Sequence, residues 1–161
     1  MNGFACGPIL TPPPAAPDGA PIVNDGWFPN VDPVDLRKAR RIPADLPAER
    51  LRDAVREAMI WANDQLEGWR AEAGGGLGHG SFADVPSPPL DGATRNLVLY
   101  QLAVGAWTKA LLVERQRDVD LTGAGQRRVE ELDASVGELR RDALHAVRRI
   151  LGQTRTNVEL L

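Results

Sequence analysis

The stretch that decides the fold is NLVLYQLAVGAWTKALLV, residues 96–113. It predicts a helix that begins near Asp91 or Thr94 and continues towards Arg117, with apolar side chains on nearly all of its sides. A helix of this kind belongs in the middle of a bundle, where other helices cover it. Glycine inside a helix costs about 1 kcal/mol relative to alanine. We therefore expect another helix to approach closely at Gly105.

The same stretch has about the minimum length for a membrane span. Gln101 and Lys109 lie inside it, however, and a charge at bilayer depth is costly. The N-terminus has no basic residues ahead of an apolar run, so it does not resemble a signal peptide. We expect a buried bundle helix and no membrane partner.

A second long helix is predicted from Asp45 or Pro47 to about Ala73. The glycine run 74–76 ends it, because glycine terminates helices and frees the following loop. Its apolar side chains recur every three or four residues and form one face, as in a helix that covers a core: Leu51, Val55, Ala58, Met59, Ala62, Leu66 and Trp69.

A third long helix is predicted after the break at residues 123–125, and it ends before Gly152. Its apolar positions also step by three or four, close to the seam of a coiled coil or an antiparallel bundle: Val129, Leu132, Val136, Leu139, Ala143, Val147 and Ile150.

A short N-terminal helix is predicted from the pair Asp32-Pro33, an acid at the cap followed by proline at the first helical position, to about Arg41. Trp27 and Phe28 lie in the loop before it. They either enter the core or face a partner, and the core is favoured because exposed aromatic pairs are uncommon.

The predicted fold class is all-α, a helical bundle of three long helices plus one short N-terminal helix, with extended N- and C-terminal arms. Residues 1–21 hold six prolines and form an extended arm, which either is floppy or drapes over a neighbouring subunit. Residues 22–152 form the helical domain. Residues 153–161 form an extended tail whose alternating pattern suits a strand. That strand has no predicted partner in its own chain, so it is a candidate for joining another protein's sheet or groove.

Composition argues against several classes of function. A formal charge of −3 and a pI near 5.4 are unlike those of a dedicated nucleic-acid binder. Cys6 is the single cysteine and cannot form an internal disulfide, which favours a reducing compartment such as the cytoplasm. The glycine-rich stretch 75–80 lacks the lysine of a phosphate loop, and His79 and His145 lie on different predicted elements. We predict that the protein is not an enzyme and has no catalytic, cofactor-binding or metal-binding residues.

Basic side chains gather on two of the predicted helices. One group lies on the short helix and the other on the last long helix: Arg37, Lys38, Arg40 and Arg41 in the first, and Arg140, Arg141, Arg148 and Arg149 in the second. A solvated face with cations near a helix C-terminus explains both groups. The alternative is contact with phosphates or with acidic partner surfaces.

Several short motifs follow one another along the chain. They are Asn24-Asp25-Gly26-Trp27-Phe28-Pro29 with Asp32-Pro33 and Arg37; Arg50-Leu51-Arg52 with Ala54, Ala58, Asn63 and Leu66; Ala83-Asp84-Val85-Pro86; Tyr100 and Ala103; and Asp118, Asp120, Gly125, Leu139-Arg140-Arg141-Asp142-Ala143 and the ending 152–161. This order resembles the phage head completion protein family, small connector proteins of contractile-tailed phages. The resemblance covers residues 22–161. The proline-rich arm departs from it, so nothing is carried over to the arm.

The resemblance implies a virion protein of the head–tail junction, made in the host cytoplasm. Such adaptors form a homo-oligomeric ring, usually of twelve copies, beneath the portal protein. The ring extends the DNA channel, retains the packaged DNA through non-specific contact and provides the docking site for tail terminator or neck proteins. By resemblance, Arg140, Arg141, Arg148 and Arg149 face the channel or the next subunit. Portal contact falls on the tail: Thr154, Arg155, Thr156, Asn157, Val158, Glu159, Leu160 and Leu161.

Two other functions stay open at this point. A small terminase subunit is also helical and ring-forming, but it recognises DNA and would need base-reading residues and a basic excess. A cytoplasmic coiled-coil interaction protein is indicated only by the seam of the last helix.

Overall fold

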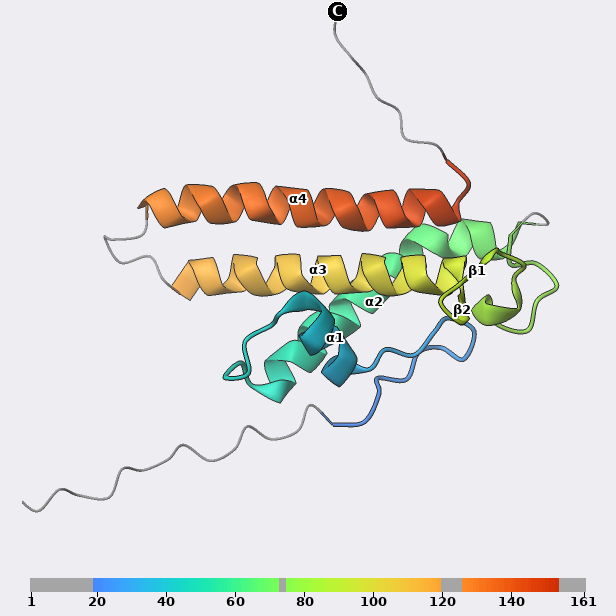
Figure 1. The fold of residues 1–161 in the computed structure, drawn as a ribbon, viewed down its shortest axis with the longest axis horizontal. Helices are drawn as coiled ribbons and strands as arrows, with labels where there is room; N and C mark the ends of the chain where they lie inside the picture. Colours follow the sequence, from blue (N-terminus) through green and yellow to red (C-terminus); the bar gives the residue numbers. More distant parts are fainter. Residues whose placement is uncertain (1–18, 73–74, 120–125, 154–161) are drawn as a thin grey trace, which may run out of the picture.

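The computed structural model describes residues 19–72, 75–119 and 126–153, without the side chains of residues 117–134. Over these ranges the chain is mainly helical and confirms the all-α prediction (Figure 1). Its elements are α1 (Pro33–Arg40), α2 (Ala48–Arg70), a short 3-10 turn (Phe82–Asp84), the two-stranded antiparallel hairpin β1 (Pro89–Leu90) and β2 (Ala93–Thr94), α3 (Arg95–Val119) and α4 (Gln126–Ile150).

Helix α3 is the centre of the bundle, as predicted from the apolar side chains on nearly all of its sides. It contacts α1, α2, α4 and the hairpin, and α4 runs antiparallel beside it along its length (Figure 1). Tyr100, Ala103, Val104 and Thr108 are fully buried on it. By length and composition Arg95–Gln116 is apolar enough to cross a membrane, but the bundle buries 56% of its most apolar window. Its hydrophobicity is therefore explained by its central position in the core.

The apolar seam of α4 packs against other helices of the same chain. Val136, Ala143, Val147 and Ile150 are all buried, and α4 packs chiefly on α3. Val129 and Leu132, which continue the seam in the sequence, lie outside the described side chains. An intermolecular coiled coil would need the same seam, so the structure does not favour that interpretation.

The helix ends lie close to the predicted positions. The Val34 amide donates to the Asp32 carboxylate over 2.8 Å, which caps α1. Helix α2 ends at Arg70, earlier than predicted, because the chain turns back over Trp69. A Cβ atom on Gly75 would lie 2.3 Å from the Trp69 carbonyl oxygen, so the turn requires glycine there. Gly152, with a φ of +71°, follows the end of α4.

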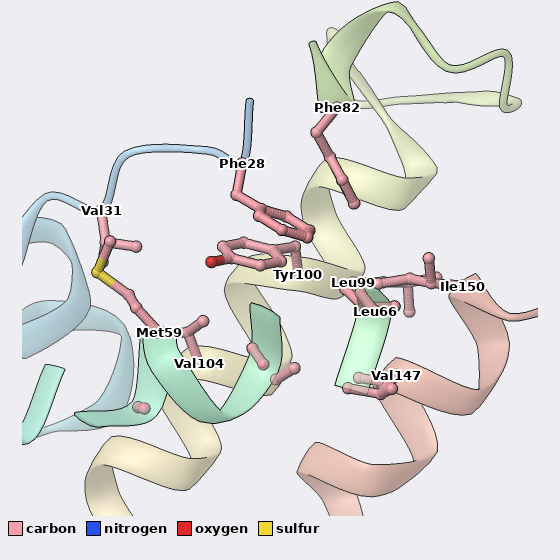
Figure 2. Packing of buried hydrophobic residues seen from close by; sticks show 14 of the residues in the cluster. Phe28, Val31, Met59, Leu66, Phe82, Leu99, Tyr100, Val104, Val147 and Ile150 are labelled. Atoms are coloured by element: carbon pink, nitrogen blue, oxygen red, sulfur yellow. The ribbon is translucent and has the colours of Figure 1, made fainter. Parts of the chain in front are cut away.

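Aromatic side chains fill the core beside α3, and Figure 2 shows Phe28, Phe82 and Tyr100 among them. The core position predicted for Trp27 and Phe28 is confirmed. The Trp27 ring meets the Phe28 and Phe82 rings edge-on at centroid distances of 4.8 and 5.7 Å. The Phe82 and Tyr100 rings lie 5.4 Å apart. The chain between Ile22 and Val31 therefore closes over α2 and α3, and the two amide–carbonyl bonds between these residues hold it as a narrow loop.

Two local features differ from the expectations. The hairpin β1–β2, with Asp91 and Gly92 at positive φ in its turn, was not predicted. At Gly105 the close neighbour is a side chain and not a helix backbone. A Cβ atom there would lie 2.5 Å from Nε of Arg40, whose Nη2 donates to the Leu102 carbonyl over 2.8 Å. The glycine makes room for a guanidinium that crosses α3.

We expect the substitution Phe82→Ala to lower the free energy of unfolding by about 3–5 kcal/mol, because it empties a fully buried position among aromatic rings. Urea denaturation followed by circular dichroism measures this. Leu77→Ala is the matched control, since that side chain is 59% exposed and should change stability by less than about 0.5 kcal/mol. Equal effects of the two substitutions would contradict the packing described for Phe82.

Candidate interaction surfaces

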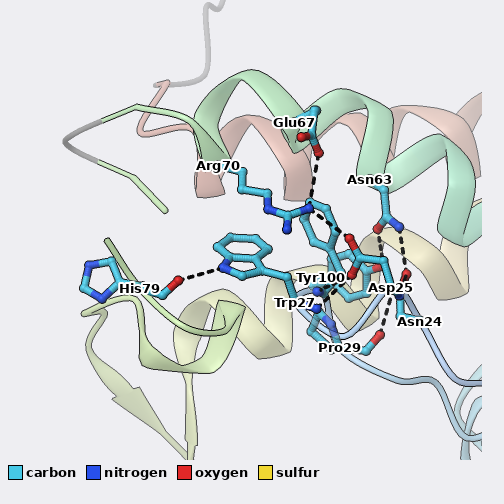
Figure 3. Close-up of polar contacts among 10 residues, drawn as sticks. Asn24, Asp25, Trp27, Pro29, Asn63, Glu67, Arg70, His79 and Tyr100 are labelled. Carbon is cyan, nitrogen blue, oxygen red and sulfur yellow. Dashed lines mark hydrogen bonds and ion pairs between the residues drawn. The ribbon is translucent and has the colours of Figure 1, made fainter. Parts of the chain in front are cut away.

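A closed ring of three hydrogen bonds joins the N-terminal loop to α2 and α3 (Figure 3). The Asn24 amide donates to the Tyr100 hydroxyl over 2.9 Å, that hydroxyl donates to Asn63 Oδ1 over 2.7 Å, and the Asn63 amide donates to Asn24 Oδ1 over 2.9 Å. Burial raises the pKa of Tyr100 well above its usual range. The hydroxyl therefore stays protonated and can keep donating. This ring is structural, and it explains three of the motif residues.

Asp25 organises the same loop. Its Oδ1 accepts the amides of Trp27 and Phe28 over 2.9 and 2.8 Å, and its Oδ2 lies 2.9 Å from Nη1 of Arg70. The Arg70 guanidinium also lies over the Trp27 ring, 4.8 Å from its centroid. Partial burial acts to raise the pKa of Asp25, but the two amide bonds and the Arg70 charge outweigh it and hold that pKa below its usual value.

The arginines predicted on α4 fall into two groups. Arg140 is held within the chain, because its Nη2 donates to Glu114 over 2.7 Å and its guanidinium lies 5.4 Å from the Trp107 ring centroid. Arg141, Arg148 and Arg149 are exposed. Of the basic residues at α1, Arg37 donates to the carbonyls of Pro43 and Leu46, whereas Arg41 is exposed. The tail residues 154–161, predicted to contact the portal, lie outside the described residues.

An open groove of about 730 Å³ brings together basic residues from three helices. The described part of its lining is four arginines, one histidine, one aspartate, one glutamine, one glycine and four apolar residues: Arg40, Arg95, Arg148, Arg149, His145, Asp142, Gln153, Gly152, Leu99, Leu102, Ala106 and Ala146. Burial lowers the pKa of Arg40, and the nearby Asp142 opposes this. Arginine keeps its charge at any physiological pH. The groove is therefore a positively charged surface, and one apolar side chain that lines it, Leu102, is exposed.

The sequence marked three arginines of this groove as basic residues but did not predict the groove itself. Arg40, Arg148 and Arg149 were among the predicted basic residues, but the sequence did not indicate that α1 and α4 would bring them together. Arg95 and the exposed Leu102 were missed. Arg95 is a single arginine at the start of an apolar helix, and nothing in its sequence context marks it.

The described residues hold no side-chain cluster that could bind a metal ion. No group of three or more histidine, cysteine, aspartate or glutamate side chains gathers among them. The glycine-rich stretch has structural roles instead. The amides of Gly75 and Gly76 donate to the carbonyls of Glu72 and Trp69, and a Cβ atom on Gly76 would lie 2.6 Å from the Trp27 ring. These amides are not available to hold a phosphate.

Comparison with known proteins identifies the class. Residues 22–161 match the family described as "Phage head completion protein (GPL)". The chain belongs to this family, which is named for a structural role and not for a reaction.

Two relatives extend this match. The "Head completion/stabilization protein" of Escherichia phage P2 is 35% identical over 149 residues, which cover 92% of this chain and 87% of the relative. The "Probable head completion/stabilization protein" of Haemophilus phage HP1 (strain HP1c1) is 26% identical over 148 residues, which cover 89% and 94%. No solved structure matches the chain.

We expect Tyr100→Phe to lower the free energy of unfolding by about 1–3 kcal/mol, because it leaves Asn63 Oδ1 without the donor that it has in the native protein. The double variant Tyr100→Phe/Asn63→Ala tests whether the three hydrogen bonds among Asn24, Asn63 and Tyr100 act as a unit. Its destabilisation in urea should be smaller than the sum of the two single effects. Additive effects would mean that the two side chains act independently.

We expect Asp25→Asn to remove a pH-dependent part of the stability. The folded-state pKa of Asp25 is depressed, so its contribution is present above the unfolded-state pKa and is lost as the pH falls through the folded-state pKa. Thermal melting at several pH values should show the largest difference between wild type and variant near neutrality, shrinking in acid. Asp35→Asn, at a far more exposed aspartate, is the control. A difference that grows in acid would contradict the assignment.

Proposed function

We propose that the protein completes the phage head as a structural component of the head–tail junction. In this proposal, copies of the chain form a ring beneath the portal protein, usually of twelve subunits. The ring extends the DNA channel, retains the packaged DNA and provides the site where tail terminator or neck proteins dock. The observation that carries the proposal is the family match over residues 22–161, together with two relatives whose names state head completion or stabilization.

The geometry of the described residues supports a role in assembly. The bundle buries a cluster of apolar residues around α3, and the side chains of Asn24, Asn63 and Tyr100 bond to one another. What remains for partners is the surface, and above all the exposed arginines of α4 and the arginine-lined groove. The small terminase alternative gains no support, because the matching family and both relatives are named for head completion.

The tail 154–161 is proposed as the portal-binding segment. It follows directly after Gln153, which lines the groove at the C-terminal end of α4. The alternation of Thr154, Thr156, Val158 and Leu160 with intervening residues suits a strand that pairs with another protein.

We expect deletion of residues 154–161 to abolish binding to the purified portal protein of the same phage while leaving the helical content unchanged, because the bundle core ends at Leu151. Co-sedimentation with the portal and circular dichroism measure the two effects. Replacement of the eight residues by glycine and serine should have the same result, since length alone does not supply the strand pattern. Normal portal binding by the deleted protein would contradict the assignment.

The role in the head is tested by electron microscopy of particles from a phage that lacks the gene. DNA-packed or leaking heads without tails would support a component added after packaging. Empty procapsids would place the protein in packaging and contradict the proposal, and intact infectious virions would contradict it as well.

A further inference from the structure

The arginine-lined groove is positively charged and partly apolar. Four arginines face it against a single aspartate, and they come from α1, α3 and α4. Leu102, which lines the groove on α3, is 44% exposed. Phosphates would be bound by the arginines alone and would leave the leucine in water. A surface that offers carboxylates around an apolar side chain matches the whole groove, so its chemistry fits a protein partner better than DNA.

The outer face of α2 has the complementary character. Asp53, Glu57, Ile60, Asp64 and Glu67 recur at alternating steps of four and three, so they form one stripe along the helix. All five are exposed, and Ile60 is 62% exposed. The residues that α2 buries against the core lie on the opposite side of the helix. The stripe therefore lies on the outward side of α2, although Glu57 reaches Arg115 of α3.

The carboxylates of the stripe remain accessible. Asp53 is paired with Arg56, and Glu67 lies 3.7 Å from Arg70, but these are pairs between partly or largely exposed side chains. Exposed pairs of this kind contribute little and can be exchanged for others. Glu57 pairs with Arg115 of α3 at a similarly exposed position. The stripe can thus offer carboxylates to a second molecule without breaking a buried interaction.

We propose that the arginine-lined groove of one copy binds the acidic α2 stripe of the next copy, with Ile60 placed against Leu102. The two surfaces share no residue, so the contact is head-to-tail. A head-to-tail pair leaves a free groove on one copy and a free stripe on the other, and repetition of the contact closes a ring when the rotation between copies allows it. The inference rests on the proposed ring and names the contact that builds it.

Site-directed cross-linking tests the contact directly. In a Cys6→Ser background, Arg149→Cys and Asp64→Cys place thiols on the groove and on the stripe of one chain. A short bis-maleimide should give a ladder of dimers, trimers and larger species, both in concentrated solution and on purified portal. The pair Arg141→Cys and Asp64→Cys is the matched control, because Arg141 is exposed on α4 but does not line the groove. Chains that carry only one of the two introduced cysteines should not cross-link. Dimers formed by such a chain, with no larger species from the double-cysteine chain, would indicate a symmetric contact and overturn the proposal.

Charge reversal supplies the second test. Arg148→Glu/Arg149→Glu and Asp64→Arg/Glu67→Arg should each weaken the association of copies at least roughly tenfold, because each places like charges opposite one another. A chain that carries all four changes should regain the ring, since both surfaces are reversed together. Native mass spectrometry of portal complexes counts the copies, and circular dichroism confirms folding.

The outcomes separate this inference from the proposed function. The proposed contact is overturned if Arg148→Glu/Arg149→Glu still forms full rings on the portal. It is also overturned if the chain with all four charge changes folds and binds the portal but does not form the ring again. Absence of any portal binding by the wild-type chain would instead count against the proposed function. The cross-link ladder in concentrated solution would still decide the contact between copies.

Discussion

Helix α3 is apolar around most of its circumference, and the need to cover it on every side shapes the rest of the molecule. Helix α4 covers one side through its apolar seam, and α1 and α2 cover others. The loop between Ile22 and Val31 closes a further side with Trp27 and Phe28. The buried Tyr100 hydroxyl would be costly without partners, and Asn24 and Asn63 satisfy it from the loop and from α2. One buried polar group thus ties three segments of the chain together.

The sequence predicts the helices well because their signals are local. Apolar spacing, the cap at Asp32 and the glycines after α2 and α4 each act within a few residues of where they stand. The predicted core position of Trp27 and Phe28 is also confirmed. The hairpin β1–β2 was missed because its strands are only two residues long and carry no alternating pattern. The groove was missed because it depends on how three helices pack, and no local pattern states that Arg40 lies near Arg148.

The arginines illustrate why residue type alone does not predict a role. Arg140 and Arg141 are neighbours in the sequence, yet one packs on Trp107 and pairs with Glu114 while the other is exposed. Arg70 orders the N-terminal loop through Asp25, and Arg40 crosses α3 where Gly105 leaves room. The charge that remains for partners is therefore smaller than the sequence suggests, and the groove gathers part of it where the start of α3 lies beside the end of α4.

The closure of the N-terminal loop has a consequence for how the chain folds. Asn24 bonds to Tyr100 across 76 positions of sequence, and Trp27 bonds to the His79 carbonyl across 52. Helices α3 and α4, by contrast, are consecutive and pair as a helical hairpin. Because the entropy of closing a long loop is lost before its contacts form, the α3–α4 hairpin can form early and the N-terminal loop docks late. Until the loop docks, Phe82 and Tyr100 lack the cover of Trp27 and Phe28, so closure of the loop removes an aromatic surface of the kind that favours aggregation.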